Sequence, residues 1–131
     1  MLSKKIMVVD DNALIRYSIS RLLEDNGYSP IEAVDGEDAL DKLYGTDNIA
    51  MVITDLNMPR LNGVDLTIRL RQDQVYKSMP VIMMSAELYE DAKKSREMAG
   101  ADELISKPFM SEELIGAVKK YTGQNKIYSL L

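Results

Sequence analysis

The segment AMVITDLNMPRLNG spans residues 50–63 and contains a short apolar run that ends on an acidic residue. The run over residues 49–53 is typical of a strand buried in a sheet. It leads to Asp55, and the pairs Met58-Pro59 and Asn62-Gly63 that follow favour a turn. The sequence therefore predicts that Asp55 lies at the C-terminal end of a buried strand. In open α/β sheets, ligands bind at that edge.

The composition is that of one globular domain. The chain has 131 residues, 46% of them hydrophobic, which is enough for a single core. It contains no cysteine, which excludes disulfides and thiolate metal sites. It also contains no histidine, which excludes imidazole zinc sites, His-based triads and a phosphohistidine carried by this chain.

The charge pattern narrows the expected partners and location. The net charge is −5, and lysines and arginines are scattered, so we expect no direct nucleic-acid binding. No apolar run is long enough to cross a bilayer, and the N-terminus lacks the pattern of a secretory signal. We therefore expect a cytoplasmic protein without membrane insertion.

Apolar segments and helical patterns alternate along the chain. Further strands are predicted at residues 5–9, 29–34, 79–84 and 104–106. Helices are predicted between them and after the last one, and the alternation implies parallel strands joined by right-handed crossovers in a helix–sheet–helix sandwich. The most apolar runs, at 6–9, 49–53 and 81–84, are expected in the middle of the sheet.

Local signals suggest where the helices begin and how they are buried. Asn12 and Ser111 are predicted N-caps, and Gly27 is the predicted residue after the first helix. In the second helix, Leu40 and Tyr44 form an apolar i/i+4 pair. The helix at 87–99 has only a thin apolar stripe, Leu88, Ala92 and Ala99, so we expect it to be among the more mobile elements.

If the strands are parallel, one edge of the sheet gathers a polar cluster: Asp10, Asp11, Asp55, Ser85 and Lys107. Clustered carboxylates repel one another and either raise their pKa values or recruit a cation. Oxygen ligands of this kind suit Mg²⁺, and the backbone carbonyl of Asn57 could complete the set.

An aspartate beside Mg²⁺ can attack phosphorus to give an acyl phosphate. Phosphoryl transfer needs mainly positioning and neutralisation of the phosphoryl oxygens, for which Mg²⁺, a lysine and a serine hydroxyl are suited. Each residue alone has a structural interpretation: acids at a helix N-terminus, turn residues, or a surface lysine. Only their conjunction at strand ends is specific.

The chain resembles the response-regulator receiver domain (CheY-like) of bacterial two-component signalling. The resemblance covers Lys5 to about Tyr121 and rests on the motifs Val8-Val9-Asp10-Asp11-Asn12, Thr54-Asp55-Leu56-Asn57-Met58-Pro59 with Gly63, Met84-Ser85-Ala86, and Gly100-Ala101-Asp102 leading to Lys107-Pro108-Phe109. It implies a flavodoxin-like (βα)5 fold: a five-stranded parallel sheet of order 2-1-3-4-5 with helices on both faces.

The resemblance also implies roles. Asp55 would accept a phosphoryl group from a histidine of a sensor kinase or phosphotransfer protein. Asp10, Asp11 and Asp55 would hold Mg²⁺ with the Asn57 carbonyl. Ser85 and Lys107 would contact the phosphoryl group, and the peptide bond after Lys107 would be cis.

Family members switch a surface that here corresponds to residues 87–121, for a downstream protein target or an output domain absent from this chain.

One departure from the family pattern is Leu104, where the family commonly has Tyr or Phe. It leaves open a degenerate receiver acting as an unphosphorylated scaffold. A Mg²⁺-dependent aspartyl phosphatase is a further alternative, disfavoured by the adjacency of Asp10 and Asp11. We expect a receiver domain over residues 1–123, with 124–131 as a tail or linker.

Overall fold

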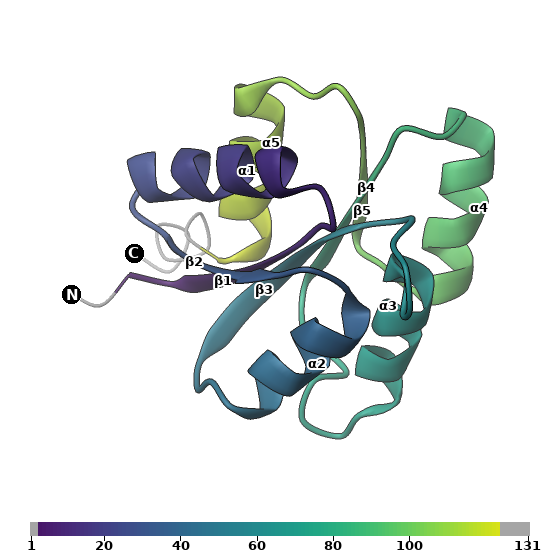
Figure 1. Cartoon of the computed structure of the whole chain (residues 1–131), viewed down its shortest axis with the longest axis horizontal. Helices are drawn as coiled ribbons and strands as arrows, with labels where there is room; N and C mark the ends of the chain where they lie inside the picture. Colours follow the sequence, from purple (N-terminus) through teal and green to yellow (C-terminus); the bar gives the residue numbers. More distant parts are fainter. Residues whose placement is uncertain (1–2, 124–131) are drawn as a thin grey trace.

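In the computed structural model, which describes residues 3–123, strands and helices alternate strictly (Figure 1). The strands are β1 (Lys5–Val9), β2 (Ser29–Ala33), β3 (Ile49–Asp55), β4 (Val81–Ser85) and β5 (Glu103–Ser106). The helices are α1 (Ala13–Asp25), α2 (Gly36–Tyr44), α3 (Gly63–Gln72), α4 (Tyr89–Ala99) and α5 (Ser111–Tyr121). The predicted tail at 124–131 lies outside the described residues.

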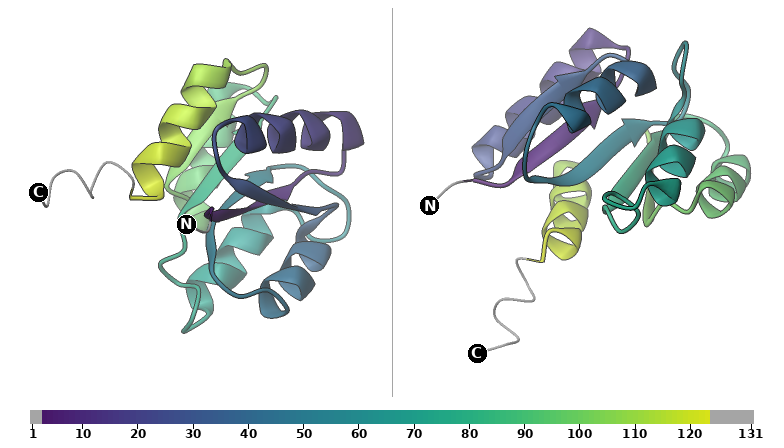
Figure 2. Two further views of the ribbon diagram at one scale, coloured as in Figure 1. Left: turned by 90° about the vertical axis from the view of Figure 1, so that its left-hand side faces the viewer. Right: turned by 90° about the horizontal axis from the view of Figure 1, so that it is seen from below.

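The strands form one parallel sheet in the order β2-β1-β3-β4-β5, as predicted. The most apolar runs occupy its three central strands. Helices α2, α3 and α4 cover one face, and α1 and α5 cover the other (Figure 2). The predicted flavodoxin-like (βα)5 architecture is therefore confirmed.

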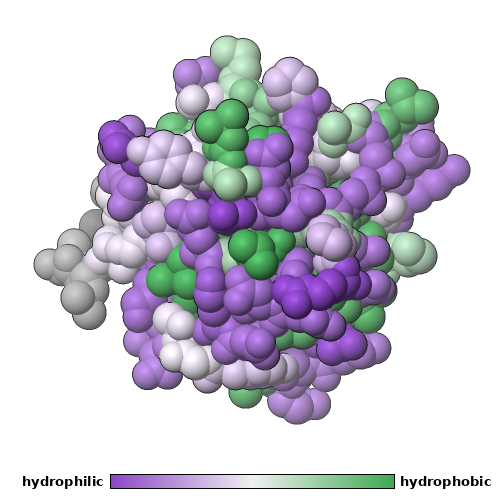
Figure 3. Space-filling model, viewed as in Figure 1, coloured by the Kyte–Doolittle hydropathy of each residue, from purple (hydrophilic) through white to green (hydrophobic). Residues whose placement is uncertain are grey.

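Two hydrophobic clusters fill the space between sheet and helices, because alternate side chains of each strand point to opposite faces. In β1, Met7 packs with α2, α3 and α4, whereas Ile6 packs with α1 and α5. Both side chains are completely buried. The face of the molecule that Figure 3 shows is mostly hydrophilic, with separate apolar patches.

Some of the local predictions are correct. Asn12 caps α1 through its side chain, which accepts hydrogen bonds from two backbone N–H groups. Gly27 follows α1 with a φ of +87°.

Three local predictions are wrong. Ser111 is the first residue of α5 rather than its N-cap, and Met110 holds the cap position without a side-chain hydrogen bond. Tyr44 and Leu88 are exposed, because Tyr44 is the last residue of α2 and Leu88 precedes the first turn of α4. At both places the helix no longer faces the core.

Among the described residues, none of the helices combines the length and apolarity that crossing a membrane requires.

Hydrogen bonds continue the parallel pairing past the strand ends and hold the following loops side by side. Asp10 N–H donates to the Ala33 carbonyl (3.1 Å), Leu56 N–H to the Met84 carbonyl (2.9 Å) and Lys107 N–H to the Ser85 carbonyl (2.8 Å), at the edges of β1, β3 and β5. The polar residues predicted at these strand ends are thus fixed along a single edge of the sheet.

The close approach of α3 to this edge depends on Gly63. Its N–H donates to the Leu56 carbonyl (3.0 Å), and a Cβ at this position would lie 2.3 Å from the Asp55 carbonyl oxygen. The start of α3 therefore packs directly against the end of β3, with no room for a side chain between them.

Gly63→Ala should consequently reduce the free energy of unfolding by about 1–3 kcal/mol, because backbone must move to admit the methyl group. Gly116→Ala is the control: Gly116 lies within α5 with no atom near the added Cβ, so alanine should stabilise by about 0.5–1 kcal/mol. Urea denaturation of both variants measures the contrast. Equal stability of Gly63→Ala and wild type would contradict this close packing of α3 on β3.

Candidate functional site

The predicted acidic cluster is present. Carboxylate oxygens of Asp10, Asp11 and Asp55 lie within 4.8 Å of one another at the C-terminal edge of the sheet. Asp10 is buried, Asp55 is partly buried and Asp11 is exposed. Asp10 and Asp11 come from the loop after β1, and Asp55 is the last residue of β3. The parallel arrangement of adjacent strands is what brings these three acids together.

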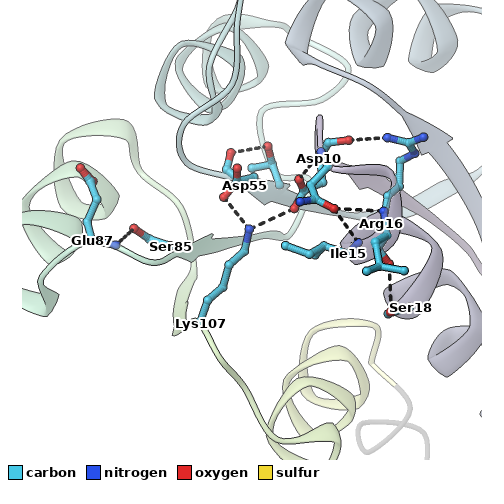
Figure 4. A network of polar contacts seen from close by, with 11 residues as sticks. Asp10, Ile15, Arg16, Ser18, Asp55, Ser85, Glu87 and Lys107 are labelled. Carbon is cyan, nitrogen blue, oxygen red and sulfur yellow. Dashed lines mark hydrogen bonds and ion pairs between the residues drawn. The ribbon is translucent and has the colours of Figure 1, made fainter.

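Lys107 lies among these acids. Its Nζ donates to Asp55 Oδ1 at 2.9 Å and to Asp10 Oδ2 at 3.1 Å (Figure 4). Its side chain is only 14% exposed. The ammonium contacts two of the three carboxylates, so negative charge exceeds positive charge within the cluster. This excess of negative charge suits a hard divalent cation, which could reach the carboxylate oxygens from solvent on the side of the exposed Asp11.

The pKa shifts show the same imbalance. Burial raises the pKa of the Asp55 carboxyl above its usual value; the charge of Asp10 adds to this effect, and Lys107 only partly opposes it. Burial disfavours the Lys107 ammonium, but hydrogen bonds and charges of Asp55 and Asp10 outweigh burial and raise the pKa of Lys107. Acid and base both hold their protons more tightly, as expected where positive charge is deficient.

Ser85 lies at the same edge of the sheet and Asn57 follows Asp55 by two residues, and neither joins the hydrogen bonds of the cluster. Ser85 is buried at the end of β4, and its Oγ accepts a hydrogen bond from the Glu87 N–H at 2.9 Å. In Figure 4 this hydroxyl points to Glu87 and away from Asp55. Asn57 is exposed in the β3–α3 loop, and among the described residues no group donates to its carbonyl oxygen. That oxygen is therefore available to a metal.

The Lys107–Pro108 peptide bond is cis, as the resemblance implied. Pro108 and its neighbour Phe109 also form one wall of an apolar groove beside the site. The groove has a volume of about 510 Å³ and is lined by Leu14, Ile15, Ser18, Ala86, Lys107, Pro108 and Phe109. Leu14 is 74% exposed, which is unusual for a large apolar side chain.

Arg16 is a site residue that sequence reasoning missed. From α1, its Nη1 donates to the backbone carbonyl of Asp10 at 2.7 Å, and its Nε donates to Glu32 of β2 at 2.9 Å. It thus holds the loop that carries Asp10 and Asp11. No motif marks this role, because the partner is a backbone atom; the only available signal was its place on the first turns of the helix after the acids.

The shift at Asp55 predicts a pH dependence of stability. A raised folded-state pKa means that the folded chain binds the proton more tightly than the unfolded chain. The wild type therefore loses stability relative to Asp55→Asn as pH rises from the usual Asp pKa of about 3.9 through the folded value. Above that value the difference stays constant.

Urea denaturation of both proteins in EDTA, at a series of pH values from about 4 to neutral, measures this difference. Asp55→Asn should be the more stable protein at neutral pH, with the gap closing towards acid. A gap that is independent of pH would show that the Asp55 charge is not destabilising.

Comparison with known proteins identifies the family. The family model described as response regulator receiver domain matches residues 6–119. Protein PilG of Pseudomonas aeruginosa is 39% identical over 89% of this chain and 86% of its own length. Chemotaxis protein CheY of the same organism is 37% identical over 88% of this chain and 94% of its own. The structure of Vibrio cholerae chemotaxis protein CheY4 is 31% identical, with a TM-score of 0.84 over 91% of this chain and 98% of that one.

The matched region contains β1 from its second residue onward, the other four strands, and the acidic edge formed by Asp10, Asp11 and Asp55. The chain therefore belongs to the response regulator receiver domain family, signalling domains of CheY-like fold.

Proposed function

We propose that the chain is a phosphoacceptor: Asp55 takes a phosphoryl group from a histidine of a partner protein in a Mg²⁺-dependent reaction. The observation that carries the proposal is the placement of the Lys107 ammonium against both Asp55 and Asp10. A lysine ammonium at that point can pair first with the Asp55 carboxylate. After phosphorylation it can pair with the phosphoryl oxygens, which then carry the negative charge.

A phosphohistidine donor must lie outside this chain, because the chain contains no histidine. The Asp55 carboxylate attacks phosphorus, the bond from phosphorus to the donor nitrogen breaks, and the imidazole leaves with its electron pair. Asp10, Asp11, Asp55 and the Asn57 carbonyl would hold Mg²⁺, which when bound neutralises phosphoryl oxygens. Lys107 remains beside the new acyl phosphate and compensates part of its charge.

The apolar groove beside Lys107 supports a protein donor rather than a small one alone. One of its lining residues is Lys107, which contacts Asp55, and its walls come mainly from α1 and the β5–α5 loop. An apolar helix surface that carries the phosphohistidine could cover Leu14 and Phe109 while presenting its imidazole to Asp55. We assign this role to a sensor histidine kinase or a His-phosphotransfer protein.

The output of phosphorylation is proposed to pass through Ser85. Its hydroxyl has a proton free to donate, and turning it towards a phosphoryl oxygen would break its bond to the Glu87 N–H. That bond precedes α4, whose N-cap residue Leu88 makes no side-chain cap. Residues 87–121 would then change for a downstream protein target, or for an output domain outside this chain.

Leu104 favours the alternative, an unphosphorylated scaffold. It is partly buried against the cluster of α2, α3 and α4 and has no hydroxyl to offer. The complete acidic edge speaks for phosphorylation, so the scaffold remains the second candidate.

Incubation with phosphoramidate and Mg²⁺ should add one phosphoryl group to the wild type, measured by intact mass. Asp55→Asn should remain unmodified, since the attacking carboxylate is gone. Asp41→Asn, an exposed acid on α2, is the matched control and should be modified like wild type. Modification of Asp55→Asn to the wild-type extent would refute the proposal.

The switch is tested separately by amide NMR spectra with and without Mg²⁺ and beryllofluoride, a phosphoryl mimic. A working switch should shift resonances through residues 87–121, including Leu104, and none of these in Asp55→Asn. Changes restricted to the neighbours of Asp55, Ser85 and Lys107 would instead favour the scaffold.

A further inference from the structure

The β3–α3 loop, residues 56–62, contains a residue in an unfavourable backbone conformation. Arg60 has a φ of +64°, in the left-handed region that side chains with a Cβ rarely adopt. Such strain persists only where surrounding contacts hold it, and it gathers at functional sites. The loop also carries Asn57, whose carbonyl is the proposed backbone ligand of Mg²⁺. The contacts that hold Arg60 therefore bear on that ligand.

Asp35 is the main contact of Arg60. It is the N-cap of α2 and is 2% exposed; its Oδ1 accepts the Asp38 N–H at 2.9 Å. Its Oδ2 accepts from Nε and Nη2 of Arg60. A buried carboxylate needs such partners, because losing one leaves charge without solvent to compensate it. The side chain of Arg60 is itself 56% exposed. The ion pair therefore matters mainly for the buried Asp35 carboxylate and for the backbone of the loop that carries Arg60.

A second contact joins the same two elements. The Gly36 N–H donates to the Leu61 carbonyl at 2.9 Å. A Cβ on Gly36 would lie 2.5 Å from that oxygen and 2.8 Å from the Leu61 Cβ. Leu61 is itself buried. The loop therefore sits directly on the first turn of α2, with Arg60 and Leu61 as adjacent attachment points.

Asn57 has no comparable attachment. It is exposed, and no described group donates to its carbonyl. The loop is anchored on one side by Leu56, which donates to the Met84 carbonyl, and on the other by Arg60 and Leu61. The position of the Asn57 carbonyl relative to the acids is therefore set by its two flanking anchors.

We propose that Asp35 and Arg60 form a latch that positions the Asn57 carbonyl for Mg²⁺. The inference rests on the proposed function of the acidic edge and assigns two positioning residues to it. With the latch closed, the loop that carries the carbonyl is already held in place, and metal binding does not have to order it. With the latch open, ordering the loop subtracts from the binding free energy.

The test is a double-mutant cycle read as Mg²⁺ affinity, measured by calorimetric titration without a phosphodonor. Arg60→Ala and Asp35→Asn should each weaken Mg²⁺ binding by about tenfold, the lower end of the effect of residues that orient metal ligands. The double variant should be no weaker than Arg60→Ala, because the contact that Asp35→Asn weakens is already absent once Arg60 is removed. Arg69→Ala, an exposed arginine on α3, is the matched control and should bind as wild type.

A kinetic readout separates positioning from stability. Phosphorylation of Arg60→Ala by phosphoramidate should need about tenfold more Mg²⁺ for half its maximal rate, with the maximal rate itself close to wild type. Thermal unfolding in EDTA reports folding separately. Loss of rate that excess Mg²⁺ does not restore, or fully additive effects of the two substitutions, would overturn the latch.

The outcomes also separate the latch from the proposed function. If wild type and Arg60→Ala bind Mg²⁺ equally and both are phosphorylated, the latch is wrong and the phosphoacceptor proposal stands. If the wild type binds no Mg²⁺ and takes no phosphoryl group, both proposals fail.

Discussion

The ammonium of Lys107 joins two carboxylates that are 52 and 97 residues away along the chain. This contact can form only if β1, β3 and β5 run parallel and end at the same edge, since each supplies one partner or the loop that carries it. Removing the lysine would leave two acids facing each other in a partly buried place. The ion pair thus depends on the topology and at the same time makes the acidic edge tolerable to the fold.

The parts of this arrangement that follow from periodicity were predictable. Apolar runs that end abruptly on Asp10 and Asp55 identify buried strands and the edge at which they stop. Because alternating strands and helices leave few topologies, the convergence of these acids with Lys107 follows from the order of elements alone. The acids and the lysine are close together in the structure, and Ser85 is at the same edge with its hydroxyl turned to Glu87.

The parts that depend on backbone geometry were not predictable. Arg16 binds a carbonyl oxygen, and Arg60 adopts a left-handed conformation next to a buried N-cap; neither leaves a recurrent pattern in the sequence. Tyr44 and Leu88 continued apolar patterns past the points where their helices face the core. Ser111 has the chemistry of a cap, but α5 begins one residue earlier than that role requires.

The arginines and the lysine near this edge of the sheet have different positions, which match the chemistry of their side chains. Arg16 lies outside the acidic cluster and donates hydrogen bonds to the Asp10 carbonyl and to Glu32. Arg60 also lies outside the cluster and donates to Asp35. A guanidinium is planar and has several donors in a fixed geometry, so one arginine can hold a loop by donating two hydrogen bonds at once. Lys107 sits inside, where a compact point charge can serve either carboxylate or a phosphoryl oxygen without a fixed orientation. An arginine inside would hold the acids in a more fixed geometry, so a lysine suits the phosphoacceptor role proposed for this edge better.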